Sequence, residues 1–205
     1  MSARLFFGLY LVLFAVCAIN PYDRPVWWAE NIPIMLLMAI AAWVHCKHHR
    51  FTALSFAMMS VFIALHTIGG HFTFARVPFG FITELFDFER NHYDRIAHFT
   101  VGFFAYPIAD ILQRRKLVNT SWLLFLFPIF SIVTLAAMYE MFEWGFANYA
   151  DAEAGIAVLG AQGDIWDAQK DMLADTLGAC LGMLVFTWWG IPHASSTASS
   201  SNKSL

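Results

Sequence analysis

Ionisable residues recur at helical spacing in three apolar stretches of this chain. They are Asp94 with His98, Glu140 with Glu143, and Asp167 with Asp171 and Asp175. Residues three or four positions apart lie on one face of a helix, so the last three would form a stripe of carboxylates. Stacked like charges repel, and they need a metal ion, a neighbouring imidazole or guanidinium, or a proton to compensate them.

A metal site is the first chemistry that this pattern suggests. Mixed imidazole and carboxylate ligands suit zinc, manganese or iron, whereas oxygen ligands alone suit magnesium or calcium. The expected cofactor is therefore a divalent metal ion such as zinc or manganese. The candidate metal ligands are His66, Asp94, His98, Glu140, Asp171 and Asp175. His71 cannot share a face of an unbroken helix with His66, and we expect it at the water interface.

Glu140 and Glu143 are the candidate catalytic residues. In the corresponding hydrolytic mechanism His98 and Asp175 hold the ion with Glu140, and Glu143 accepts a proton from the bound water. No HExxH signature is present, and the three cysteines show no CxxC spacing. The structural alternative is that these side chains only join the helices by hydrogen bonds, which we favour for any single residue. For the set as a whole, the functional interpretation is stronger.

The composition identifies the elements that position these residues. Hydrophobic residues make up 59% and charged residues 13% of the 205 positions, and soluble domains carry about 25% charged residues. Only helices or closed barrels satisfy their backbone groups in a bilayer, and these apolar runs do not alternate as barrel strands do. The predicted spans are Leu5–Ile19, Val26–Val44, Phe51–Gly69, Ile96–Leu112, Trp122–Trp144 and Met172–Trp189. The fold class is therefore an all-α, polytopic transmembrane helix bundle of about six spans.

One transmembrane domain is expected over residues 1–190, followed by a disordered cytoplasmic tail over 191–205, which is rich in Ala and Ser. The run after Arg4 resembles a signal peptide, but we favour a retained first span. The lipid bilayer is the expected partner. Nucleic acid is excluded, because Lys and Arg form no stripe with interleaved aromatic residues.

Positively charged residues predict the orientation. One side of the membrane would carry Arg4, Lys47, Arg50, Arg114, Arg115, Lys116 and Lys203. The excess on this side predicts that both termini are cytoplasmic. The candidate ligands then gather near the outer leaflet, where we expect a pocket that opens outward. Asp110 lies near the other side, and an ion pair with Arg114 four residues later accounts for it.

Four segments resemble a known family. They are His66–His71 (HTIGGH), Asn91–Phe99 (NHYDRIAHF), Tyr139–Trp144 (YEMFEW) and Gln162–Met172 (QGDIWDAQKDM). The chain resembles the YjdF family of uncharacterised bacterial inner-membrane proteins from the first span to about Trp189. The resemblance implies an inner-membrane address and no known activity. More loosely, Asp94 with His98 and the later Asp171, Asp175 and Gly178 look like VanZ-type membrane proteins.

Three hypotheses for function follow. The first is an inner-membrane protein whose outward pocket binds a metal or cation and hydrolyses an envelope or lipid-linked substrate. The second is a small proton-coupled transporter that uses the same carboxylates as a relay, which requires further ionisable groups toward the cytoplasm. The third is a structural or accessory membrane subunit.

Overall fold

Helices form all the regular structure in the residues that the computed structural model describes, 1–150 and 152–190. The tail predicted over residues 191–205 lies outside these ranges. The helices are α1 Ala3–Cys17, α2 Arg24–Lys47, α3 Ala53–Phe72, α4 Gly80–Leu85, α5 Tyr93–Val101, the 3-10 helix η1 Gly102–Phe104, α6 Ala105–Arg114, α7 Ser121–Tyr149, α8 Ala152–Leu159, α9 Asp167–Val185 and the π-helical η2 Phe186–Gly190. The all-α prediction is confirmed.

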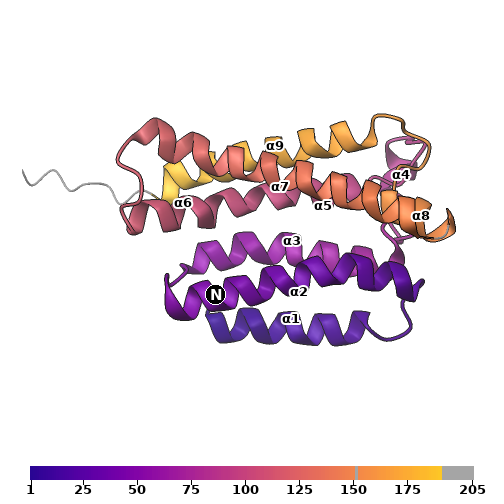
Figure 1. Cartoon of the computed structure of the whole chain (residues 1–205), viewed down its shortest axis with the longest axis horizontal. Coiled ribbons are helices and arrows are strands. Elements are labelled where there is room, and N and C mark those ends of the chain that lie inside the picture. The colour runs from indigo at the N-terminus through magenta and orange to yellow at the C-terminus, as the bar shows by residue number, and fades with distance from the viewer. Residues whose placement is uncertain (151, 191–205) are drawn as a thin grey trace, which may run out of the picture.

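The long helices run side by side in two groups (Figure 1). One group holds α1, α2 and α3 around an apolar cluster that includes Phe6, Ile34 and Phe56. The other holds α5 with α6, α7 and α9 around a second cluster that includes Ile132 and Met183. Helix α3 contacts α5 and α6 and thereby joins the two groups.

Within the described residues, four helical segments are long and apolar enough to cross a membrane: α2, α3, α7 and α9 with η2. Helix α1 has 15 residues, which is shorter than the roughly 20 residues that a bilayer requires. The run from Tyr93 to Arg114 is divided into α5, η1 and α6. All six predicted runs are therefore helical, and the molecule is a helical membrane bundle.

Pro107 explains why the helix from Tyr93 to Arg114 is interrupted. Proline lacks a backbone N–H, and its ring clashes with the carbonyl four residues earlier, here that of Phe103. The 3-10 helix η1 occupies Gly102–Phe104, directly at this position. The interruption separates α5, which carries Asp94 and His98, from α6.

Glycines let α9 approach this interrupted helix closely. A Cβ atom on Gly178 would lie 1.8 Å from the carbonyl oxygen of Phe99, and one on Gly102 would lie 2.1 Å from the backbone nitrogen of Ala179. Only residues without a side chain fit such a backbone contact. This contact holds the acidic face of α9 against α5.

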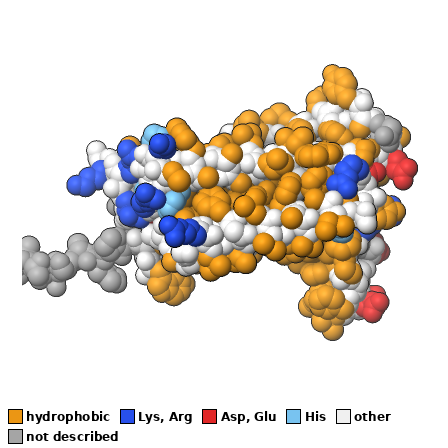
Figure 2. Space-filling view, turned by 90° about the horizontal axis from the view of Figure 1, so that it is seen from below, with side chains coloured by type: hydrophobic (Ala, Val, Ile, Leu, Met, Phe, Trp, Pro, Cys, Tyr) orange, Lys and Arg blue, Asp and Glu red, His pale blue; other side chains and the backbone are white. Residues whose placement is uncertain are grey.

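Charge divides the two ends of the bundle (Figure 2). Exposed basic residues gather at one end, which we call the basic end: Arg4, Lys47, Arg50, Arg114, Arg115 and Lys116. The other end, which we call the mixed-charge end, carries the turns between α1 and α2, between α3 and α5, and between α7 and α9 (Figure 1). On the face that Figure 2 shows, most coloured side chains between the two ends are apolar. This distribution is typical of a protein whose middle lies in hydrocarbon.

Candidate functional site

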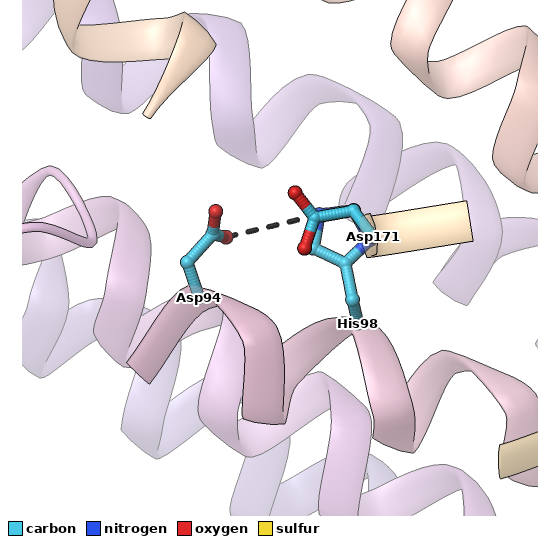
Figure 3. A group of neighbouring side chains, drawn as sticks. All are labelled: Asp94, His98 and Asp171. Carbon is cyan, nitrogen blue, oxygen red and sulfur yellow. Dashed lines mark ion pairs between the residues drawn. The ribbon is translucent and has the colours of Figure 1, made fainter. Parts of the chain in front are cut away.

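Three candidate ligands meet between α5 and α9 near the mixed-charge end: Asp94, His98 and Asp171 (Figure 3). Each offers one possible ligand atom, and these atoms lie within 4.8 Å of one another. The Asp171 side chain is 4% exposed and that of Asp94 is 13% exposed. Asp94 lies in the first turn of α5, where the helix dipole favours a negative charge.

His98 interacts with carboxylates through both of its ring nitrogens. Its Nδ1 atom lies 3.2 Å from Oδ2 of Asp175, and its Nε2 atom lies 3.8 Å from Oδ1 of Asp94. An ionised carboxylate only accepts hydrogen bonds, so the Nδ1 proton is directed at the closer partner, Asp175. The Nε2 lone pair of neutral His98 is then left on the side of Asp94.

Two arginines compensate part of the acidic stripe on α9. Arg95 Nη1 lies 3.0 Å from Oδ1 of Asp171, and Arg95 also donates to Asp167. Arg90 donates to Asp167 as well, from the segment before α5. The sequence predicts that a guanidinium could compensate the stripe, but it does not identify Arg90, because Arg90 belongs to no helical repeat with the acidic residues.

The two glutamates of α7 share the electrostatic environment of this cluster. Glu143 is buried, and both Glu140 and Glu143 interact electrostatically with His98 and Asp94. Among the described residues, neither Oε1 of Glu140 nor Oδ1 of Asp175 has a hydrogen-bond partner. Buried carboxylate oxygens without partners are rare and call for an explanation such as an ion or a proton.

His66 belongs to a second group. Its Nε2 atom lies 3.4 Å from Oε2 of Glu30, and that same oxygen accepts a hydrogen bond of 2.7 Å from the Tyr139 hydroxyl. The ring of Tyr139 lies between the two groups, with its centroid 6.1 Å from that of His66 and 6.4 Å from that of His98. The structure thus brings Asp94, His98, Asp171 and Asp175 together and pairs His66 elsewhere.

Two ionisable residues outside the predicted metal site, His71 and Asp110, have specific partners. His71 belongs to α3, which runs unbroken to Phe72. Its Nδ1 atom lies 2.9 Å from the carbonyl oxygen of Cys17. Asp110 forms the expected ion pair with Arg114 at 3.6 Å, and it also contacts His49 at 3.0 Å. Both His49 and Asp110 are buried, so an ionisable pair also exists near the basic end.

An ionic network lies at the mixed-charge end, around the turn before α9. Asp164, in the turn before α9, accepts hydrogen bonds from Lys170 at 2.6 Å and from the backbone N–H of Trp166. These bonds lower the pKa of Asp164 below its ordinary value. Arg90 donates to the carbonyl oxygen of Gly160, which ties the same turn to the segment before α5.

Cavities at this end have other linings. One of about 430 Å³ has walls that include Tyr22, Asp23, Arg76 and Glu153, and a neighbouring one of about 400 Å³ includes Arg76, Glu89 and Arg90. No candidate metal ligand lines either of these two cavities. The His and carboxylate cluster lies between packed helices rather than on their walls.

The comparisons with known proteins agree with the helical bundle. The family model described as "predicted membrane protein (DUF2238)" matches residues 2–191. The chain is 30% identical over 163 residues to inner membrane protein YjdF of Escherichia coli (strain K12), and this alignment covers 78% of the chain and 77% of the relative. No solved structure matches. The chain is a membrane protein that belongs to the DUF2238 family, which also fits the resemblance to YjdF.

Proposed function

We propose that this protein binds a divalent metal ion through Asp94, His98 and Asp171 at the mixed-charge end of the bundle. The observation that carries the proposal is the convergence of three ligand atoms within 4.8 Å. Ligand atoms around a tetrahedral zinc ion lie roughly 3.3 Å apart, given bonds of about 2.0 Å. Small side-chain rotations would be enough to reach that spacing.

The balance of charge supports a cation. Five carboxyl groups of α5, α7 and α9 interact electrostatically with His98: Asp94, Glu140, Glu143, Asp171 and Asp175. Among the described residues, the positive side chain that forms an ion pair with this set is Arg95, which it shares with Asp167, and a neutral His98 adds no charge. A charged side chain costs about 2.5 to 3.5 kcal/mol at the centre of a span and less toward its end, so an uncompensated excess in this buried group would still be unfavourable. A bound divalent ion would compensate two negative charges.

The position of Asp175 suits a residue that orients the metal-binding His98. Metal-binding histidines commonly donate their second N–H to a carboxylate, which orients the ring and raises its basicity. Asp175 Oδ2 lies at that position, 3.2 Å from Nδ1 of His98. Asp175, which the sequence predicts as a ligand, then acts as a positioning residue.

Hydrolysis is the reaction that this site suits. A bound metal ion would supply an acidified water, and Glu140 and Glu143 are the neighbouring groups able to accept its proton. The unpartnered Oε1 atom of Glu140 supports this assignment. The substrate class is an envelope or lipid-linked molecule that reaches the site from the bilayer.

The orientation completes the proposal. The protein would lie in the inner membrane, with both termini and the basic end in the cytoplasm. The exposed Lys and Arg residues of the basic end support this direction through the positive-inside rule. The metal site would then face the periplasmic side.

Elemental analysis of the detergent-purified protein tests the metal site. The wild type should hold stoichiometric zinc, manganese or iron, and His98→Ala and Asp171→Asn should lose it while keeping their helical circular dichroism. His66→Ala is the matched control, because this buried histidine pairs with Glu30 instead. Absence of metal in the wild type, or equal loss in His66→Ala, would argue against the proposal.

A proton-coupled carrier is the second candidate. The buried pair of His49 and Asp110 favours it, because a relay needs ionisable groups toward the basic end. In this case protons compensate the carboxylates. Proteoliposomes should then show proton flux, followed with a pH-sensitive dye, that Asp110→Asn abolishes. A protein that holds no metal and shows no such flux would favour the third hypothesis, a structural or accessory membrane subunit.

A further inference from the structure

Two adjoining cavities at the mixed-charge end have walls of mixed character. The larger, of about 430 Å³, lies between the turn before α2, the turn after α3 and helix α8. The smaller, of about 400 Å³, shares Ala75, Arg76 and Gln162 with it. Arg76 therefore stands where the two cavities meet. This side chain is the starting point for assigning a ligand.

Arg76 is held in place without an acidic partner. Its guanidinium lies 4.0 Å from the centroid of the Tyr22 ring, and it donates a hydrogen bond to the Tyr22 hydroxyl. Within residues 1–150 and 152–190, no carboxylate lies within ion-pair distance of it. Arg90, Arg95 and Arg114, in contrast, all have such partners. An oriented guanidinium with unused donors suits a phosphate group.

Carboxylates that line the larger cavity together with Arg76 restrict the net charge of the ligand. Asp23 and Glu153 both line the larger cavity with Arg76. Asp23 already accepts a hydrogen bond from the backbone N–H of Val26, at the start of α2. Glu153 forms no ion pair within the described part of the chain. Two negative groups beside one positive group disfavour a purely anionic ligand and favour one that carries an amine as well.

Apolar groups complete the wall. Ile156 and Ala157 of α8 line the larger cavity, and the side chain of Ile156 is 72% exposed. Helix α8 packs on α2 through Val26, Ala29, Ala154 and Val158. The apolar edge of the cavity is thus continuous with the helices that enter the bilayer. A ligand with an acyl chain could lie along this edge while its polar group reaches Arg76.

We propose that the larger cavity binds a ligand that joins a phosphate to an amine, as the headgroup of a zwitterionic phospholipid does. Arg76 takes the phosphate, and Glu153 takes the ammonium group. Burial of apolar chain atoms along Ile156 adds to the affinity.

This cavity is separated from the metal-binding group by one thin wall. Gly160 lines the cavity, and a Cβ atom at Gly160 would lie 3.2 Å from Oδ2 of Asp94. A headgroup in the cavity would therefore lie beside the proposed metal site. Its binding does not depend on a metal, so the two proposals can fail separately.

The test measures binding to the full-length protein in detergent by thermophoresis. The probes are dioctanoyl phosphatidylethanolamine, dioctanoyl phosphatidylglycerol, dioctanoylglycerol and free glycerophosphoethanolamine. Arg76→Gln should weaken phosphatidylethanolamine binding by about tenfold or more, because it removes a charge-assisted hydrogen bond. Arg24→Gln is the matched control and should leave it unchanged. Arg24 lies at the same end and also stacks on an aromatic ring, that of Trp27 at 5.1 Å, but lines neither of the two cavities.

Further arms separate the parts of the proposal. Glu153→Gln should reduce the preference for phosphatidylethanolamine over phosphatidylglycerol, and His98→Ala should bind phosphatidylethanolamine as the wild type does. Free glycerophosphoethanolamine that binds as tightly as the lipid would support a soluble phosphoamine, and weaker binding would support the lipid. Equal affinities in Arg76→Gln and wild type, equal binding of dioctanoylglycerol, or tighter binding of phosphatidylglycerol would overturn the proposal.

Discussion

At the scale of single residues, the environment of His98 distinguishes its two nitrogens. Nδ1 is held by Asp175, and Nε2 lies toward Asp94 and the Asp171 side of the cluster. The same imidazole with an unsupported Nδ1 would populate two tautomers, and only one of them has a lone pair on Nε2. Asp175 therefore decides which nitrogen is available to a ligand.

Replacing Asp175 by Asn should lower zinc affinity by about 10- to 100-fold, the usual cost of losing a supporting carboxylate. The neutral amide accepts a weaker hydrogen bond from His98 and no longer raises its basicity. Competition with a chromophoric zinc chelator measures the change. Glu30→Gln alters the carboxylate beside His66 and should keep wild-type affinity. If Asp175→Asn binds zinc as tightly as the wild type, Asp175 does not position His98.

Asp164 provides a prediction on pH that lies outside the spans. Its pKa is lowered by the hydrogen bonds from Lys170 and from the backbone of Trp166. Folding therefore favours the ionised form, and this contribution is present above the unfolded pKa, near 3.9. It is lost as the pH falls through the lower folded pKa. Asp164→Asn should melt below the wild type at pH 7, and the difference should be smaller at about pH 3.

Thermal melting in detergent at both pH values measures this effect. Glu84→Gln is the control, because this exposed carboxylate forms no ion pair in the described residues. A difference between Asp164→Asn and wild type that persists unchanged at low pH would show that the charge is not responsible.

At the scale of elements, the contact between α9 and the interrupted helix positions the site. Asp171 and Asp175 lie on α9, whereas Asp94 and His98 lie on α5. The two backbones meet at Gly102 and Gly178. Small residues let the backbones approach closely, and short polar side chains on the neighbouring helices can then contact one another.

Gly178→Ala should destabilise the bundle by about 1 to 3 kcal/mol, as overpacked substitutions do. The added methyl group would lie 1.8 Å from a backbone oxygen that cannot rotate away. Gly145→Ala in α7 is the matched control, because a Cβ atom there meets nothing within 4 Å. It should be neutral or stabilising, since Ala is the better helix former. Denaturation in mixed micelles measures the free energy of unfolding of both variants. If the two variants are equally stable, the close contact at Gly178 does not limit the stability of the bundle.

At the scale of the whole molecule, charge and apolar surface describe how the bundle sits in a membrane. The apolar belt lies between a basic end and a mixed-charge end (Figure 2). Large apolar side chains such as Leu36, Leu135 and Leu177 are exposed along the helices. This exposure would be costly in water and is expected where the solvent is lipid.

The proposed orientation predicts which loops a membrane-impermeant maleimide can reach in intact cells. Asp87→Cys, between α4 and α5, should react from outside, whereas Asn119→Cys, between α6 and α7, should react only after permeabilisation. Both positions are exposed, and Cys17, Cys46 and Cys180 are first replaced by Ala. The reverse labelling pattern would place the metal site in the cytoplasm.

The sequence by itself determined the helices and much of the cluster. Apolar runs of bilayer length leave the backbone no alternative to helix, and the spacing of Asp94 with His98 and of Asp171 with Asp175 sets their common faces. Those relations are local, so they survive whatever the neighbouring helices do. The ends of the helices shifted by a few residues, because turns and caps rather than apolar runs define them.

Only the tertiary structure decided which helical faces meet. It paired His66 with Glu30 and Tyr139, although His66 had looked equivalent to His98 as a ligand. It also brought Arg90 to Asp167, 77 positions away, and His49 to Asp110, 61 positions away. Spacing along a helix says nothing about such contacts, because they depend on how the backbones pack. Close packing at Gly178 and the break before Pro107 shape the contact of α9 with α5 here.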